Sequence, residues 1–277
     1  MKLYEKFKKG MCTYIIIFVC ILAYILKLYF KYTTTGDAQS VEILLGAHYK
    51  TFVLTYNEFY RLITYSFIHN SIIHLAFNMY SLYIIGTSIE EEFGHIKFIL
   101  FYFIGALFGS LTTGVLINNS IEVGASGAIY CLFAIFFLYY FKNVKEINRI
   151  SLYMLLAVEI GINFIPGISW TCHLGGVIAG LLIFAIETSM KKEVTINTQT
   201  NIIEKVRNKL TLNTYLLTLL LLVSVFVLGY KYIKSKDKLQ LYGGTDSNYI
   251  SYVYQLGNLD KAAYYAEIYM NEYLKGE

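Results

Sequence analysis

The residues of this sequence that could do chemistry are one serine and several histidines, each at the start of an apolar run. Ser126 stands in the motif Gly-Ala-Ser-Gly, four residues separate His69 from His74, and His173 is followed by Leu-Gly-Gly. A serine hydroxyl becomes a nucleophile when an adjacent base removes its proton, and histidine is the side chain that most often acts as that base. These residue types indicate nucleophilic serine chemistry, provided that the fold brings them together.

The composition is that of a membrane protein. Hydrophobic residues make up 56% of the 277 residues, charged residues only 15%, and the mean hydropathy is +0.51. Soluble globular domains carry about a quarter charged residues. The four cysteines are scattered and predict no disulfide framework, and no cysteine or histidine pair has zinc-finger spacing. We therefore expect a protein of the lipid bilayer, with no metal site and no nucleic-acid partner.

Apolar stretches long enough to form membrane helices recur along the chain. A helix needs about 20 mostly apolar residues to cross the hydrocarbon core. The stretches that approach this length are 13–30, 70–89, 96–117, 124–141, 150–165, 172–189 and 212–230. They predict an all-α polytopic transmembrane bundle, with a six-helix core over residues 13–189 and a seventh helix after it. The remaining units are a cytoplasmic N-terminus (1–12), a cytoplasmic linker (190–211) and a C-terminal helical unit (239–277).

The distribution of lysine and arginine predicts the orientation in the cell membrane, because cytoplasmic loops carry an excess of both. Before the seventh span, most of them fall at the N-terminus and in the segments after spans two, four and six. The N-terminus is therefore expected in the cytoplasm and the C-terminus outside, although lysines also follow the seventh span. Spans two, four and six then all begin at the outer side. His69, His74, Ser126 and His173 share that depth, where ionisable groups usually face an interior cavity.

The fourth span is short for a membrane helix. From Ser126 to Phe141 it measures about 24 Å as a helix, whereas the hydrocarbon core is about 30 Å thick. We therefore expect the segment before Ser126 to dip into the membrane, which non-helical backbone tolerates only where it lines a wet cavity. A hydrolase needs such a cavity for its water.

Each motif also has an interpretation without chemistry. Gly-Ala-Ser-Gly in a membrane helix is often a site of close packing, and Gly176 with Gly180 forms a GxxxG pair that would let span six approach span four. His74 and Asn78 lie on one helical face and could be bonded across helices. The chemical interpretation gains weight because all the motifs fall at one depth.

In order and spacing, these segments resemble the rhomboid family of intramembrane serine proteases over roughly residues 44–188. The family pattern is a Trp-Arg start, a His–four residues–His–three residues–Asn run, Gly-x-Ser-Gly, and a final His followed by small residues. The corresponding residues here are Tyr60-Arg61, His69, His74, Asn78, Gly124-Ala125-Ser126-Gly127, and His173 with Gly176 and Gly180. Glu90 and Gly94 match the Glu–three residues–Gly that ends the second core helix of the family. Tyr130 matches the family tyrosine that packs on the catalytic histidine. Tyrosine in place of the tryptophan is a departure, and both residues suit an interface.

The resemblance implies a serine endopeptidase that works with a Ser-His dyad and needs no cofactor. Ser126 would attack the scissile carbonyl and His173 would act as its base, with Tyr130 as packing support, since no Asp or Glu stands where it would orient the imidazole. His74, the Asn78 amide and the backbone N–H of Ser126 would meet the oxyanion. The supporting residues are His69, Gly124, Gly127, Gly176 and Gly180. The implied partners are single-span transmembrane proteins, cleaved near the outer face of their span.

Two other functions fit part of the pattern. A catalytically inactive rhomboid relative would bind or dislocate membrane proteins, but such relatives lose the serine or the histidine that this chain keeps. A proton-coupled transporter would use His69, His74 and Glu159 as its path, but it predicts inverted repeats of which the sequence gives no sign.

Two further segments carry weaker signals. Glu159 and Asn163 lie four apart on span five and are predicted to bond to the loops around the site. The segment from Gly257 to Ala266 resembles the second half of a tetratricopeptide repeat, although an isolated repeat cannot bury its own face. An amphipathic tail is the alternative. As a repeat, it would be a docking element for a protein partner.

Overall fold

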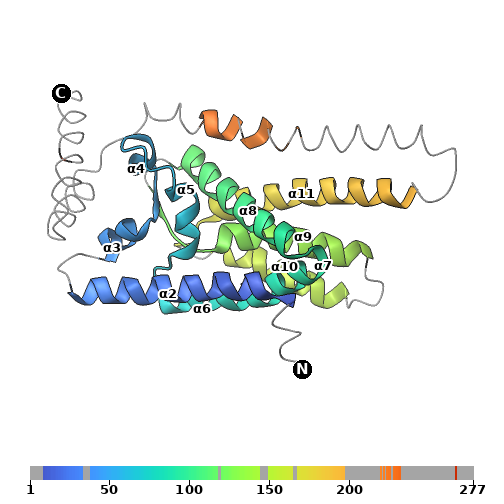
Figure 1. Cartoon of the computed structure of the whole chain (residues 1–277), viewed down its shortest axis with the longest axis horizontal. Helices are drawn as coiled ribbons and strands as arrows, with labels where there is room; N and C mark the ends of the chain where they lie inside the picture. The colour runs from blue at the N-terminus through green and yellow to red at the C-terminus, as the bar shows by residue number, and fades with distance from the viewer. Residues whose placement is uncertain are drawn as a thin grey trace.

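In the computed structural model the described part of the chain is a bundle of helices with a small two-stranded sheet (Figure 1). The structure describes residues 9–33, 38–117, 120–143, 149–164 and 167–196, together with 219, 221, 223–225, 227–231 and 266. Within these residues, four helices are long and apolar enough to cross a membrane: Met11–Thr33, Ile72–Phe93, His95–Leu116 and Trp170–Ser189. The prediction of an all-α polytopic bundle is confirmed. About half of the seventh span, and almost all of the C-terminal unit, lies outside the described residues.

The long helices alternate with shorter elements along the chain. After α2 (Met11–Thr33) come α3 (Ala38–Leu45), β1 (His48–Tyr49), α4 (Lys50–Leu54), α5 (Arg61–Thr64) and the 3-10 turn η1 (Tyr65–Phe67). The second long helix consists of α6 (Ile72–Ser81), the π-helical turn η2 (Leu82–Gly86) and α7 (Thr87–Phe93) end to end. It is followed by α8 (His95–Leu116), β2 (Ile121–Glu122), α9 (Ser126–Asn143), α10 (Arg149–Ile162) and α11 (Trp170–Ile196). The first six predicted spans each fall on one of these helices, while the division into cytoplasmic and outer units stays a prediction.

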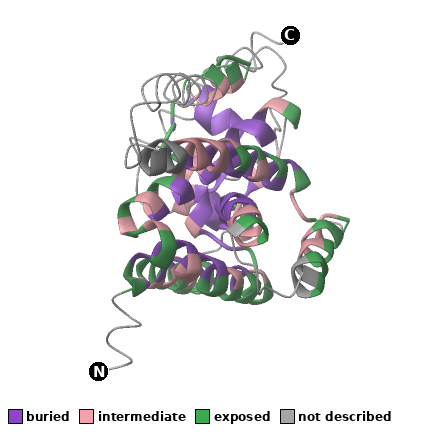
Figure 2. Ribbon diagram, turned by 90° about the vertical axis from the view of Figure 1, so that its right-hand side faces the viewer, coloured by how far each residue is buried: buried purple, intermediate pink, exposed green. Residues whose placement is uncertain are grey.

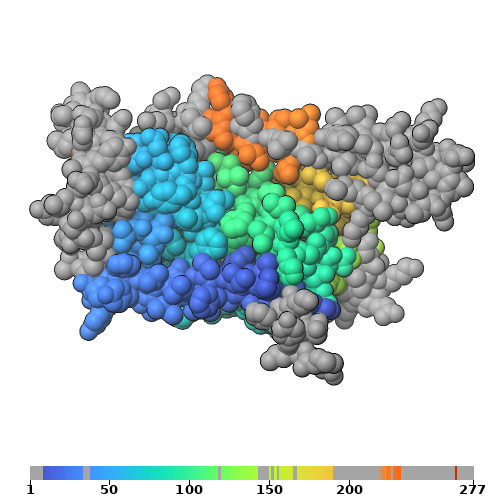
Figure 3. Space-filling model, viewed as in Figure 1, coloured from blue at the N-terminus to red at the C-terminus, as the bar shows by residue number. Residues whose placement is uncertain are grey.

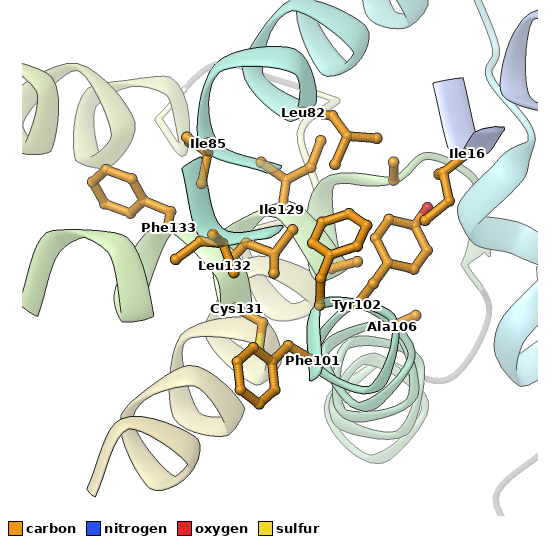
Figure 4. Close-up of a cluster of buried hydrophobic side chains, with 14 of the residues drawn as sticks. Ile16, Leu82, Ile85, Phe101, Tyr102, Ala106, Ile129, Cys131, Leu132 and Phe133 are labelled. Carbon is orange, nitrogen blue, oxygen red and sulfur yellow. The ribbon is translucent and has the colours of Figure 1, made fainter. Parts of the chain in front are cut away.

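The centre of the bundle is α9, which packs against α8, α11 and the second long helix. Ile129 and Leu132 of α9 lie in one apolar cluster with Tyr102 of α8 and with Leu82 and Ile85 of η2 (Figure 4). Buried residues gather in the middle of the molecule and exposed ones lie on its outer helices (Figure 2). The helix that begins with the candidate nucleophile Ser126 is therefore surrounded by the other helices of the bundle.

Apolar residues also cover much of the outside, as expected for a protein whose solvent is lipid. α2 forms one edge of the molecule (Figure 3), and its exposed side chains include Ile15, Phe18, Leu22 and Ile25. α10 packs mainly against α9 and exposes Met154 among other apolar residues. These faces would be unfavourable in water, which agrees with a multi-pass membrane protein.

The N-terminal end of α2 is held by a carboxylate from the second long helix. The side chain of Glu90 accepts hydrogen bonds from the backbone N–H groups of Cys12 and Thr13, each at 2.8 Å, and from the Thr13 hydroxyl at 2.6 Å. The first N–H groups of a helix have no partner within the helix, and an anion there is stabilised by the helix dipole. Glu90 therefore caps α2 and ties the first two long helices together.

The region between α2 and α6 is joined to the segment that precedes Ser126. β1 pairs with β2 in antiparallel register, with His48 opposite Glu122 and Tyr49 opposite Ile121. The backbone N–H of Gly124 also donates to the carbonyl of Tyr65 at 3.0 Å. The approach to α9 is thus held at two points by backbone hydrogen bonds.

Candidate active site

Ser126 is the first residue of α9, and its side chain is partly exposed whereas its neighbours Ala125 and Gly127 are buried. The carbonyl of Ala125 already accepts the N–H of Ile129 at 2.9 Å, so the helix begins here. The backbone N–H groups of the first turn, that of Ser126 included, therefore have no partner within the helix. Such a helix start favours negative charge, which is what a developing oxyanion requires.

Gly124 brings the segment before Ser126 into contact with His74. Its φ of +120° lies in a region that side chains other than glycine rarely adopt. A Cβ at this position would lie 2.6 Å from Cε1 and 2.7 Å from Nε2 of His74. The imidazole of His74 thus packs directly on the backbone next to the serine, and only glycine leaves room for it.

His173 lies in the first turn of α11 and is 5% exposed. Its imidazole stacks on the ring of Tyr130, with the ring centroids 4.0 Å apart and the planes 11° from parallel. Tyr130 is four residues after Ser126 and therefore lies on the same face of α9. The imidazole is consequently held beside the face of α9 that begins with Ser126. The described residues offer no hydrogen-bond partner to the Ser126 hydroxyl, so the pairing of Ser126 with His173 stays a prediction.

Glycines allow α9 and α11 to pack backbone against backbone. A Cβ at Gly176 would lie 2.1 Å from the carbonyl oxygen of Gly127, and one at Gly180 would lie 2.4 Å from that of Cys131. Gly127 in turn leaves room for the sulfur of Cys172, which would be 2.7 Å from an added Cβ. The separation between the serine and the histidine is therefore determined by main-chain contact.

The residues predicted to bind or support the oxyanion lie in and just before α6: His74 and Asn78 are on the helix, and His69 precedes it. The backbone N–H of His74 donates to Ser71 Oγ, and the ring nitrogen Nδ1 of His74 lies 3.0 Å from Oδ1 of Asn70. The Asn78 amide donates to the carbonyl of His74 at 2.9 Å and is buried. His69 stacks edge-on against His74, with ring centroids 5.1 Å apart. Burial, and then the neighbouring His74, lower the pKa of His69 to about 3, so that it is neutral at physiological pH.

Comparison with known proteins gives the family. A family model described as the Rhomboid domain matches residues 56–189. The chain belongs to the rhomboid family. The resemblance inferred from the motifs is thereby confirmed.

Rhomboid relatives occur in plants and bacteria. The chain is 33% identical to RHOMBOID-like protein 4 of Arabidopsis thaliana over 132 residues, which are 46% of this chain and 34% of that protein. It is 27% identical to Rhomboid protease GluP of Bacillus subtilis over 179 residues, which are 63% of this chain and 34% of that protein. Across four Arabidopsis relatives the matched segment spans between 34% and 49% of their length.

One side chain of this rhomboid domain contacts the candidate base although the sequence assigns it elsewhere. Asn163 follows α10, and its Oδ1 lies 2.6 Å from Nδ1 of His173. Its amide nitrogen lies 3.1 Å from the Tyr130 hydroxyl and 2.8 Å from the carbonyl of Glu159. The prediction that Asn163 bonds to the surrounding loops is wrong, because its partners are the base, the stacked tyrosine and its own helix. The signal in the sequence is an amide near the end of a largely apolar span, four residues after Glu159.

Buried charges hold α3 and the residues just before α6 against α2. The Lys27 amine donates to the carboxylate of Glu42, to the carbonyl of His69 at 3.1 Å and to that of Asn70 at 2.7 Å. It therefore fixes the two residues that lead into α6 and His74. Lys27 carries no signal of this role in the sequence, because a lysine near the end of a membrane helix is usually one that reaches the interface.

Arg61 plays a similar part in the region between α2 and α6. It is fully buried, its Nη2 lies 2.5 Å from the carboxylate of Glu58, and its Nη1 donates to the carbonyls of Ile43 and Ala47. Because these carbonyls end α3 and precede β1, Arg61 holds the strand that pairs with β2. The Tyr60-Arg61 motif is thus connected to the segment before Ser126 through the small sheet.

Among the described residues, one group could hold a metal ion by distance alone: Cys12, Glu90 and His95. It lies at the opposite end of the second long helix from His74. Glu90 is the carboxylate that caps α2, and Nδ1 of His95 lies 2.5 Å from it. We assign this cluster a structural role.

Proposed function

We propose that this rhomboid is an intramembrane serine endopeptidase in which Ser126 is the nucleophile and His173 the base. The stacking of the His173 imidazole on Tyr130, one helical turn after Ser126, is the observation that carries the proposal. With Nδ1 turned toward Asn163, the other ring nitrogen, Nε2, is the one left for the serine hydroxyl.

The mechanism follows from these positions. Nε2 of His173 takes the proton of Ser126 as Oγ forms a bond to the scissile carbonyl carbon, and the carbonyl π electrons move to its oxygen. When the tetrahedral intermediate collapses, the C–N bond breaks and Nε2 gives its proton to the leaving amine. A water molecule, deprotonated by the same nitrogen, then hydrolyses the acyl-enzyme and restores the serine.

Three groups are available to stabilise the oxyanion: the Ser126 N–H at the start of α9, the His74 imidazole against Gly124, and the Asn78 amide. Donors of this kind, placed where charge develops, each contribute about 10²–10³ in rate. One N–H of the Asn78 amide donates to the His74 carbonyl. The amide nitrogen has a second N–H, which is the one available to the oxyanion.

The substrates are single-span transmembrane proteins cut near the outer face of their span, with the N-terminus of the enzyme in the cytoplasm. A helical substrate hides its carbonyls in hydrogen bonds and must unwind before one can reach Ser126. Gly or Pro near the cut favours this step, since each weakens a helix, by about 1 and 3 kcal/mol respectively relative to Ala. Glycines on both sides of the serine favour a small residue before the cut.

The test uses the purified full chain in liposomes with a panel of single-span substrates, and a serine-reactive phosphonate as an independent probe. Wild type should cleave and should be labelled, Ser126→Ala should do neither, and His173→Ala should lose cleavage. Ser88→Ala is the matched control, because Ser88 is half-buried at the far end of the second long helix and, among the described residues, its hydroxyl bonds only to a carbonyl of that same helix, that of Ile84 at 2.8 Å. Cleavage sites are mapped by mass spectrometry.

Retained cleavage by the Ser126→Ala protein would refute the assignment of the nucleophile. A well-folded wild type that binds the substrates without cutting them would point to the inactive class of rhomboid relatives. Cuts confined to the cytoplasmic end of the substrates would contradict the proposed orientation.

A further inference from the structure

We propose that Asn163 is a positioning residue, whose side-chain amide holds His173 in the tautomer that presents Nε2 to Ser126. Asn163 can act in this way only if Ser126 and His173 are nucleophile and base, so the inference rests on the proposed function. It adds a third member, a neutral amide, to what the motifs imply is a Ser-His dyad.

The orientation of the Asn163 amide follows from its neighbours. Its nitrogen lies 2.8 Å from the backbone carbonyl of Glu159, which can only accept. The same nitrogen lies 3.1 Å from the hydroxyl oxygen of Tyr130, whose own proton is directed at the Glu159 carbonyl, 2.7 Å away. Both neighbours therefore require the NH₂ group on this side, which leaves Oδ1 facing His173.

The tautomer of His173 follows in turn. Oδ1 of an amide is an acceptor, so the imidazole nitrogen 2.6 Å from it must carry a proton. In a neutral imidazole the other nitrogen then has the lone pair, and a base needs that lone pair toward the hydroxyl. A histidine in the opposite tautomer would present an N–H to Ser126 and could not accept its proton.

Tyr130 gives this arrangement its rigidity. Its ring fixes the plane of the imidazole by stacking, and its hydroxyl fixes the amide that selects the tautomer. The phenol and the amide are thus positioned by one carbonyl, that of Glu159, in the last turns of α10. His173 is almost fully buried, and Asn163 is the acceptor that the described residues offer to its Nδ1.

An amide suits this position better than a carboxylate would. A charged side chain at membrane depth is costly unless it is paired, whereas the amide orients the imidazole without adding charge. A carboxylate at residue 163 would also accept the Nδ1 proton, but it would favour the protonated imidazole. Asparagine and aspartate at residue 163 should therefore orient the His173 imidazole equally well but give different pH dependences of the activity.

The experiment measures kcat, KM and the pH profile of the purified full chain in liposomes with a fluorogenic single-span substrate. The variants are Asn163→Ala, which removes the acceptor, and Asn163→Asp, which keeps it. Phe164→Ala is the matched control, because Phe164 is the next residue along and is exposed. Nitrogen-15 NMR of the histidine rings, with the His173 signals assigned from a His173→Ala sample, reads the tautomer directly in wild type and variants.

We expect Asn163→Ala to lower kcat by about tenfold or more with little change in KM, because a base in the wrong tautomer is inactive. Asn163→Asp should keep most of the turnover at neutral pH and move the acidic limb of the profile to higher pH. Wild type should show a protonated Nδ1, and Asn163→Ala a mixture of tautomers. Phe164→Ala should match wild type throughout.

Wild-type kcat and tautomer in Asn163→Ala would overturn the inference while leaving the proposed function intact. Asn163→Asp with the low turnover of Asn163→Ala and an unshifted acidic limb would also overturn it, since a purely structural amide predicts that result. If Asn163→Ala fails to fold, the acidic limb and NMR spectrum of Asn163→Asp decide. Cleavage by Ser126→Ala would instead remove the proposed function itself.

Discussion

Replacing Gly176 by alanine should reduce activity by separating α11 from α9, although it removes none of the reacting groups. The added Cβ would lie 2.1 Å from the carbonyl oxygen of Gly127 and 3.2 Å from the backbone nitrogen of Cys131. Both obstacles are main-chain atoms, so no change of side-chain rotamer can relieve the contact. Because favourable contacts lie near about 3.5 Å, the two helices must move apart by roughly 1 Å.

The size of the effect follows from where this displacement occurs. Gly127 is adjacent to Ser126, and Gly176 is less than one turn from His173, so the movement is transmitted almost fully to the reacting pair. A misplacement of about 1 Å can reduce a rate by about 10²-fold. Overpacking of a core typically costs about 1–3 kcal/mol of stability, which a stable bundle tolerates. We therefore expect a folded protein with kcat reduced by about two orders of magnitude.

The assay is turnover of a single-span substrate, together with the thermal midpoint of the same preparation. Gly161→Ala is the matched control, because an alanine Cβ on that glycine of α10 meets nothing within 4 Å. That variant should be as active as wild type. A Gly176→Ala protein that cleaves at the wild-type rate would refute the view that main-chain contact determines the serine–histidine separation.

Two further predictions concern other parts of the chain. Asn78→Ala should lower kcat by about 10²-fold with little effect on KM, as expected for an oxyanion donor, and an unchanged kcat would remove Asn78 from that role. Glu90→Gln should lower the free energy of unfolding by roughly 1–3 kcal/mol, because it weakens the charge-assisted hydrogen bonds that cap α2, while the active site at the other end of the helix is unaffected. The control is Glu91→Gln, which loses only the exposed ion pair with Lys9 and should change stability little; equal thermal midpoints for the two variants would contradict the capping role.

The positions of the first six helices could be predicted from the sequence, and so could the common side at which spans two, four and six begin with their motifs. Apolar length alone predicts where the first six helices fall, and the charge distribution predicts that spans two, four and six run the same way. Ser126 and His173 could therefore be paired before any contact was known. The glycine spacing at Gly176 and Gly180 likewise predicts the close approach of α11 to α9.

Contacts that depend on the rotation of a helix about its axis could not be predicted. In lipid, the outward face of a helix is as apolar as the inward face, so hydrophobic periodicity gives no measure of that rotation. The direction in which the Asn163 side chain points from the end of α10, and hence its hydrogen bond to His173, could not be predicted for this reason. β1 and β2 escaped prediction because two-residue strands are too short to show the alternation that marks a strand.

The cap on α2 has a consequence for the order in which the protein assembles during synthesis. The N–H groups of Cys12 and Thr13 are made early, whereas Glu90, which accepts their hydrogen bonds, is 78 and 77 residues further along the chain. Until the second long helix has emerged and inserted, water or lipid headgroups must accept the hydrogen bonds of those N–H groups. The first helix can therefore reach the membrane alone but can take its final position only as part of a hairpin with the second. A ribosome stalled before codon 90 would hold a nascent chain whose first span is inserted but not yet docked.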